Sequence, residues 1–180
     1  FPLAYIFGDI LTEVYGYAKA RRVIWIGFAM NLLMVLTFWG VGALPEDSLW
    51  GLQSSYDNIL GFVPRIVLGS LVAYLVGEFV NSYILAKMKV KTGGKKLWAR
   101  AIGSTVIGQF LDTTIFLLIA FAGILPWSLI GVIWITNYIF KILVEILLLP
   151  VTYKMVAWLK KEEDVDFYDT ETNFKPVTIK

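Results

Sequence analysis

Polar and ionisable side chains recur at helical spacing inside apolar segments of this sequence. Side chains three or four positions apart lie on one face of a helix, so each set presents its groups together. Carboxylates and amides that share a face suit the binding of a donor-rich small molecule. We predict that these nine residues bind substrate and that none is catalytic. The sets are Asp9 with Glu13; Glu78 with Asn81; Gln109 with Asp112; and Asn137, Lys141 and Glu145.

The depth of these side chains makes their charges expensive. A helix rises about 1.5 Å per residue, so a side chain ten residues from a membrane boundary lies near the midplane of a core about 30 Å thick. An ionised side chain there costs about 2.5 to 3.5 kcal/mol. Five carboxylates lie at about this depth in the sequence, whereas only one lysine, Lys141, lies at a comparable depth. Either some carboxylates are protonated, or a cation or a donor-rich ligand completes the site.

Structural roles compete with binding roles at several of these positions. Glu145 and Lys141 fit an intrahelical ion pair as well as they fit ligand contacts. Hydrogen bonding between helices is the preferred interpretation of Asn81 and Asn137. For Asp112 the preference is reversed, because its segment carries no basic residue at that depth. We expect Lys141 to pair with a buried acid, since an unpartnered ammonium at the midplane loses its proton.

The elements that position these residues are membrane helices. Hydrophobic residues make up 58% of the 180 residues and charged residues 17%, far from the average of soluble proteins. Histidine and cysteine are absent, which excludes disulfides, thiol nucleophiles and Cys/His metal sites. The composition predicts an all-α membrane protein, a polytopic helical bundle with residues 1–159 in the membrane domain and 160–180 in a charged, mobile cytoplasmic tail. Its five hydrophobic segments cover about 3–20, 23–44, 62–87, 97–123 and 128–159.

Lysine and arginine residues orient the predicted helices. Basic clusters at 19–22, 87–100 and 160–161 belong in the cytoplasm under the positive-inside rule, whereas the acidic connection at 45–61 belongs outside. These assignments alternate if all five segments cross the membrane, which places the C-terminus in the cytoplasm. The first segment is barely long enough to cross, and a half-inserted helix is an alternative. The chain begins without methionine, so we expect the native protein to extend further toward its N-terminus.

Two stretches resemble a known family. The opening FPLAYIFGDILTEVYGYAKARR and the later GQFLDTTIF are similar to the queuosine precursor transporters, also described as integral-membrane vitamin uptake transporters. The resemblance extends through residue 159 and implies a sixth hydrophobic segment before this chain begins. It implies import of 7-cyano- and 7-aminomethyl-7-deazaguanine across the bacterial inner membrane for tRNA modification salvage. It also implies a helix arrangement similar to the substrate-binding subunits of energy-coupling-factor transporters.

The residues agree with this implied substrate. A 7-deazaguanine base presents a ring N–H beside an exocyclic amine, and a carboxylate accepts both. We therefore predict a secondary transporter, with proton coupling through a carboxylate as one option. The alternatives are a binding subunit that needs a separate energising complex, and an intramembrane carboxylate-metal enzyme. We expect no enzyme activity, cofactor, metal or nucleic acid; the predicted partners are the base and membrane lipid, and homo-oligomerisation is left open.

Overall fold

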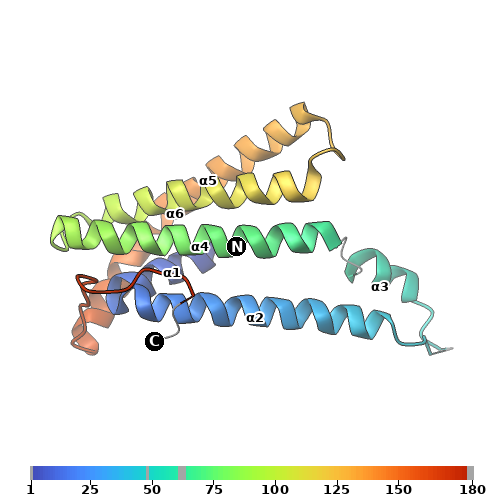
Figure 1. The fold of residues 1–180 in the computed structure, drawn as a ribbon, viewed down its shortest axis with the longest axis horizontal. Helices are drawn as coiled ribbons and strands as arrows, with labels where there is room; N and C mark the ends of the chain where they lie inside the picture. The colour runs from blue at the N-terminus through green and yellow to red at the C-terminus, as the bar shows by residue number, and fades with distance from the viewer. Residues whose placement is uncertain (1, 48, 61–63, 178–180) are drawn as a thin grey trace.

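The chain folds into a bundle of helices in a computed structural model that describes residues 2–47, 49–60 and 64–177 (Figure 1). Five helices correspond to the five predicted hydrophobic segments, and a short helix follows the second. The predicted start of the third segment at Phe62 lies outside the described residues. The helices are α1 (Pro2–Tyr15), α2 (Tyr17–Gly42), α3 (Gln53–Leu60), α4 (Pro64–Thr92), α5 (Leu97–Phe121) and α6 (Trp127–Glu162).

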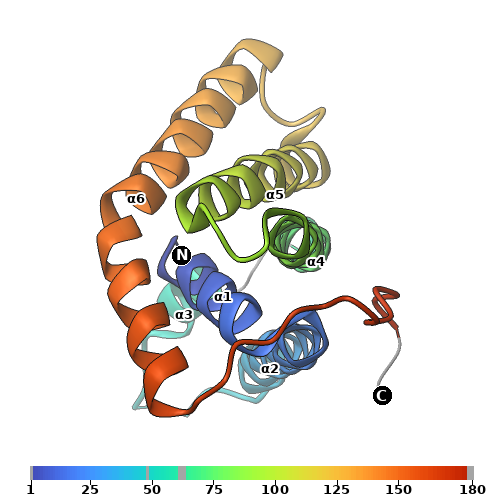
Figure 2. The same cartoon turned by 90° about the vertical axis from the view of Figure 1, so that its left-hand side faces the viewer.

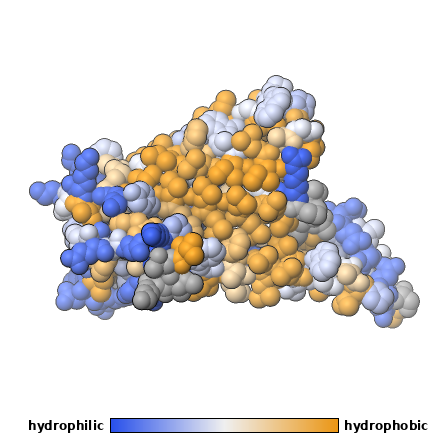
Figure 3. Space-filling view, viewed as in Figure 1, coloured by the Kyte–Doolittle hydropathy of each residue, from blue (hydrophilic) through white to orange (hydrophobic). Residues whose placement is uncertain are grey.

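The surface of the bundle fits a bilayer. Apolar residues form a band across the middle, and hydrophilic residues gather at the two ends (Figure 3). Helices α2, α5 and α6, together with the stretch from α3 through α4, are long and apolar enough to span a membrane, so the protein is a multi-pass membrane protein. Helix α1 has 14 residues and a length of about 21 Å. Its own crossing therefore stays a prediction, and the half-inserted alternative fits its length.

Helix α1 lies at the centre of the bundle, with α2, α4, α5 and α6 around it (Figure 2). A turn at Gly16 reverses the chain between α1 and α2, with φ at +84°. Glycine adopts this left-handed conformation without steric cost. Because α1 is surrounded, even its polar side chains Asp9, Thr12 and Glu13 are buried. The fold thus places the acidic face of the opening segment in the interior.

Glycines bring α4 and α5 close together. A Cβ atom at Gly77 would lie 2.8 Å from the Cβ of Asp112, and one at Gly108 would lie 2.9 Å from the Cβ of Asn81. Small residues let membrane helices approach closely and gain packing contacts. This approach sets the two polar pairs of α4 and α5 beside one another. At the far end of α5, Arg65 donates to the carbonyl oxygens of Ile119 and Ala122, and so caps the helix C-terminus.

The basic end, defined as the end formed by the Gly16 turn, residues 93–96 and the end of α6, has two features that the hydrophobic segments alone do not describe. Helix α4 continues to Thr92 instead of ending at Lys87, because Lys89 finds buried acceptors and lysines favour a helix C-terminus. Residues 163–176, predicted to form a mobile tail, make defined contacts with the bundle in this structure. They cross the basic end and pack on the bundle, with Asp169 buried and the Arg21 guanidinium bonded to the carbonyl oxygen of Asn173.

Candidate functional site

A cleft of about 330 Å³ between α4, α5 and α6 combines an acid, a base and an aromatic face. The Lys141 Nζ atom lies 2.6 Å from Asp112 Oδ2 and 3.4 Å from Thr113 Oγ1. The predicted pairing of Lys141 with a buried acid is therefore confirmed. The Asn137 side chain and the Phe116 ring also line the cleft. Acceptor, donor, amide and ring are the groups that orient a flat, polar heterocycle in a ligand site.

A second set of buried polar atoms, on α1, α4, α5 and α6, is rich in hydrogen-bond acceptors. The Asn81 side-chain nitrogen donates to Asp9 Oδ1 at 2.6 Å. Four buried carboxylate and amide oxygens from α1, α4, α5 and α6 have no hydrogen-bond partner among the described residues. Glu145 comes from α6, which packs against α1. The unpaired atoms are Asp9 Oδ2, Asn81 Oδ1, Gln109 Oε1 and Glu145 Oε1.

Unpaired acceptors at this burial require donors or protons. A buried polar group without a hydrogen bond costs about 1 to 3 kcal/mol. A buried carboxylate without a cation costs more, and it usually takes up a proton instead. Asp9 and Glu145 are 1% and 2% exposed, and no ion pair of either is found within the described part of the chain. This set is therefore suited to protons or to a donor-rich ligand.

Glu78 lies in a different cleft from Asp112. That cleft, about 380 Å³ in volume, opens between α1, α2 and α4, and its lining is apolar apart from Glu78, Ser82 and Tyr74. The Glu78 carboxylate lies against Gly8, where an added Cβ would be 3.1 Å from Oε2. Glu78 follows Gly77, the residue at which α4 approaches Asp112 of α5 most closely among the α4 glycines, with an added Cβ 2.8 Å from the Cβ of Asp112. The two clefts thus flank one acidic region.

Glu13 belongs to an ion cluster at the basic end and not to the unpaired set. Arg100 donates to both of its oxygens, at 3.2 and 2.7 Å, and Lys160 Nζ lies 2.8 Å from Oε1. Lys89 donates to its backbone carbonyl and lies 3.7 Å from Oε1. Lys89 and Lys160 also bind Asp166, at 2.5 and 2.9 Å. This arrangement joins α1, α4, α5, α6 and the segment after α6.

The structure thus divides the nine predicted residues by location. Asp112, Asn137 and Lys141 share the α4–α5–α6 cleft. Asp9, Asn81, Gln109 and Glu145 carry the unpaired acceptors around α1, whereas Glu78 and Glu13 lie apart, as described above. Sequence reasoning missed Lys89, Lys160 and Asp166 as members of the ion cluster. Lysines near a membrane boundary indicate the cytoplasmic side in the same way whether they are exposed or buried, so the sequence did not distinguish these two cases.

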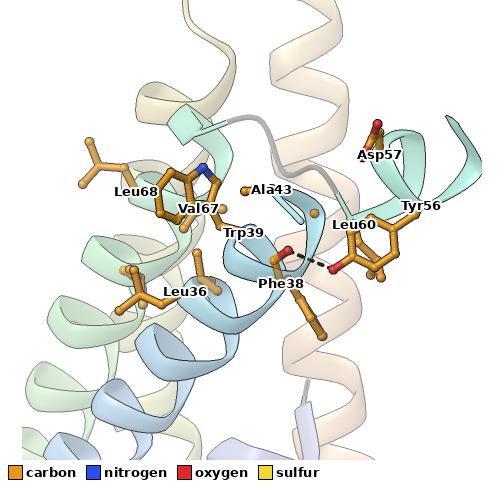
Figure 4. Close-up of a pocket in the computed structure, with 12 residues that line it drawn as sticks. Leu36, Phe38, Trp39, Ala43, Tyr56, Asp57, Leu60, Val67 and Leu68 are labelled. Carbon is orange, nitrogen blue, oxygen red and sulfur yellow. Dashed lines mark hydrogen bonds between the residues drawn. The ribbon is translucent and has the colours of Figure 1, made fainter. Parts of the chain in front are cut away.

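A pocket of about 590 Å³ between α2, α3 and α4 is larger than either polar cleft but has different chemistry (Figure 4). Its walls are mainly aliphatic and aromatic, including Leu36, Trp39 and Leu68. The Tyr56 hydroxyl is used internally, because it donates to the Phe38 carbonyl oxygen at 2.8 Å. A polar base would find few partners here, so this pocket is not the candidate site.

Comparison with known proteins identifies the family. A family profile described as "putative vitamin uptake transporter" matches residues 1–155. The chain belongs to this family. It is 33% identical over 156 residues to a probable queuosine precursor transporter of Bacillus subtilis, covering 86% of this chain and 68% of the relative. It is 25% identical over 150 residues to the queuosine precursor transporter of Escherichia coli, covering 81% and 65%.

These matches make this vitamin uptake transporter family member a membrane transport protein and not an enzyme. A probable queuosine precursor transporter of Haemophilus influenzae is also 25% identical, over 162 residues. The transporter spans about two thirds of the length of these relatives. No solved structure matches the chain, so the likeness to energy-coupling-factor binding subunits stays a prediction.

Proposed function

We propose that this protein imports a 7-deazaguanine precursor of queuosine and binds it in the cleft between α4, α5 and α6. The observation that carries the proposal is the Asp112–Lys141 pair, which offers an acceptor and a donor 2.6 Å apart beside the Phe116 ring. The names of the relatives, queuosine precursor transporters, favour the same substrate class.

The chemistry of the base matches the cleft. Its ring N–H and exocyclic amine face the Asp112 carboxylate, which accepts both hydrogen bonds. The ring carbonyl faces the Lys141 ammonium or the Asn137 amide, and the flat base lies against Phe116. At about 330 Å³, the cleft falls within the usual size range of small-molecule sites.

Binding by the purified protein tests this proposal. Asp112→Asn replaces one acceptor oxygen by a donor, and leaves a buried donor of the base without a partner. Such a loss costs about 1 to 3 kcal/mol, so the affinity for 7-cyano-7-deazaguanine should fall by about tenfold or more. Asp57→Asn is the matched control, because Asp57 lines the apolar pocket instead. Equal affinity of Asp112→Asn and the parent would refute the role of Asp112.

We also propose that the unpaired acids around α1 couple import to protons. Asp9 and Glu145 come from α1 and α6, and both are buried without a basic partner in the described ion pairs. In proteoliposomes, an inward proton gradient should accelerate uptake, and Asp9→Asn should abolish the acceleration. Accumulation of the base in proteoliposomes that contain only this protein would exclude a binding subunit that needs an energising complex. An equal rate of uptake with and without the proton gradient would exclude proton coupling.

A further inference from the structure

The segment after α6, residues 163–176, forms a strap across the basic end. It lies outside the part of the chain that matches the family profile, which ends at residue 155. It is nevertheless bound at several points to the bundle. Figure 2 shows it running from the end of α6 past α1 and over α2. The strap therefore links the end of α6 to the α1–α2 turn and to α2.

The first contact fixes the turn between α1 and α2. The Phe167 amide donates to the carbonyl oxygen of Val14, which lies in the last turn of α1, at 3.1 Å. Asp169 accepts from the Tyr17 amide at 3.0 and 3.2 Å and so caps the first turn of α2. The Phe167 ring fills the space beside Gly16, where an added Cβ would lie only 2.3 Å from it. The strap thus holds both helices of the turn.

The second contact closes the ion cluster. Asp166 is the only residue of the strap in the described ion pairs, and it binds both Lys89 and Lys160. Without it, the cations Lys89, Lys160 and Arg100 would share the single carboxylate of Glu13. Asp166 therefore stabilises the junction between α1, α4, α5 and α6 through its charge.

The third contact anchors the far end of the strap. The Phe174 ring packs edge-on against Tyr83, with ring centroids 5.2 Å apart, and lies 5.0 Å from Tyr17. The Lys87 ammonium lies 4.2 Å from the Phe174 ring, a cation–π contact. Arg21 donates to the carbonyl oxygens of Asn173 and Lys175. Aromatic packing and backbone capture together hold the strap on α2 and α4.

These contacts lie next to the unpaired carboxylate oxygen of Asp9 on α1. Asp9 is one helical turn from Glu13, so the unpaired acceptors around α1 adjoin the ion cluster. The cluster joins α1 to α4, α5 and α6 at the basic end. The positive-inside rule places this end in the cytoplasm.

We propose that the strap is a gate for release into the cytoplasm. Docked as in this structure, it holds the α1–α2 turn and the ion cluster closed. Its release frees the turn, separates α1 from its neighbours and opens the route past Glu13. This inference rests on the proposed transport function, but the movement of the strap can be measured without substrate.

A reversible cross-link tests the gate. The sequence has no cysteine, so Tyr83→Cys with Phe174→Cys creates the only pair. A short bis-maleimide with a reducible centre should join them and tie the strap to α4. Uptake of 7-cyano-7-deazaguanine by proteoliposomes should fall at least tenfold and return after reduction. Each single-cysteine variant, treated identically, should keep its uptake. A pair that cannot be joined, or a joined protein that transports at full rate, would overturn the proposal.

A labelling experiment separates this proposal from the choice of substrate. Thr12 is fully buried below the strap, so a cysteine at this position should react slowly with a polar thiol reagent. Adding Asp166→Asn should raise that rate at least fivefold by weakening the strap. Adding Asp57→Asn, remote from the strap, should leave it unchanged. An equal rate in the Asp166→Asn variant would refute the gate, even if the protein transports the base. Faster labelling without binding of the base would refute only the proposed substrate.

Discussion

Two acids one turn apart on α1 should respond very differently to the same chemical change. Glu13→Gln and Asp9→Asn each replace a buried carboxylate by an amide of nearly the same shape. Glu13 is 1% exposed and is bonded to Arg100 and Lys160. Asp9 is also 1% exposed, but its hydrogen-bond partner is the neutral Asn81. We expect Glu13→Gln to destabilise the fold strongly, and Asp9→Asn to change its stability little.

The size of the difference follows from what each change leaves behind. Removing one partner of a buried ion pair costs about 3 to 5 kcal/mol, because the other charge stays buried. Arg100 keeps its bonds to the Thr92 hydroxyl and the Lys95 carbonyl, and Lys160 is 23% exposed. We therefore expect the lower end, about 3 kcal/mol, for Glu13→Gln. Asp9→Asn removes a charge that lacks a cation, so we expect a change within about 1 kcal/mol or a gain.

Thermal unfolding of both variants in one detergent measures this contrast. For a chain of this size, 1 kcal/mol shifts the melting temperature by about 2 to 4 °C, so Glu13→Gln should melt roughly 6 to 12 °C below the parent. Asp9→Asn should melt within about 4 °C of it. Equal melting temperatures of the two variants would show that the cation cluster does not distinguish these acids, and would refute the reasoning.

Three further predictions concern the cleft, the topology and the strap. Lys141→Met should lower expression and uptake because it leaves Asp112 without its cation. The double variant Lys141→Met with Asp112→Asn should recover expression but not uptake. Unchanged uptake in the single variant would contradict the pairing. In intact cells, an impermeant thiol reagent should label a cysteine at Ser54 but not one at Lys91, and the reverse pattern would overturn the topology. The pKa of Asp166 is raised by partial burial but lowered further by its two lysine bonds, so the net pKa lies below its ordinary value. The stabilising contribution of Asp166 is complete above about pH 4 and is lost as pH falls through the lowered pKa. A fluorescent probe attached to the strap should therefore report detachment of the strap only in acid.

Much of the fold was predictable because the membrane imposes strict rules. The apolar segments had to be helices, since lipid offers no partner to backbone polar groups. The predicted segment at 97–123 and the observed α5, Leu97–Phe121, differ by two residues at one end. The pairing of Lys141 with an acid was predictable for the same reason, because an isolated ammonium is costly at that depth. The sequence did not tell which acid it would bind.

The strap was not predictable from composition. A segment rich in Asp and Glu normally indicates a solvated tail. Here its binding depends on the shape of the bundle: Gly16 leaves room for the Phe167 ring, and the Tyr17 amide at the start of α2 is directed at Asp169. The burial of Lys89 depends on the same arrangement, because its acceptors come from α1 and from the strap. Such contacts between distant segments leave no periodic pattern.

The division of the acids into paired and unpaired groups connects structure with transport. Glu13 and Asp112 have cations within hydrogen-bond distance, so their charges bind helices to one another. Asp9 and Glu145 keep unpaired oxygens, which can take up a proton or accept a hydrogen bond from a ligand. Helix α1 carries one acid of each kind, four residues apart. Any movement that separates Glu13 from its cations must therefore also change the surroundings of Asp9, and this links opening at the basic end to the state of the interior acids.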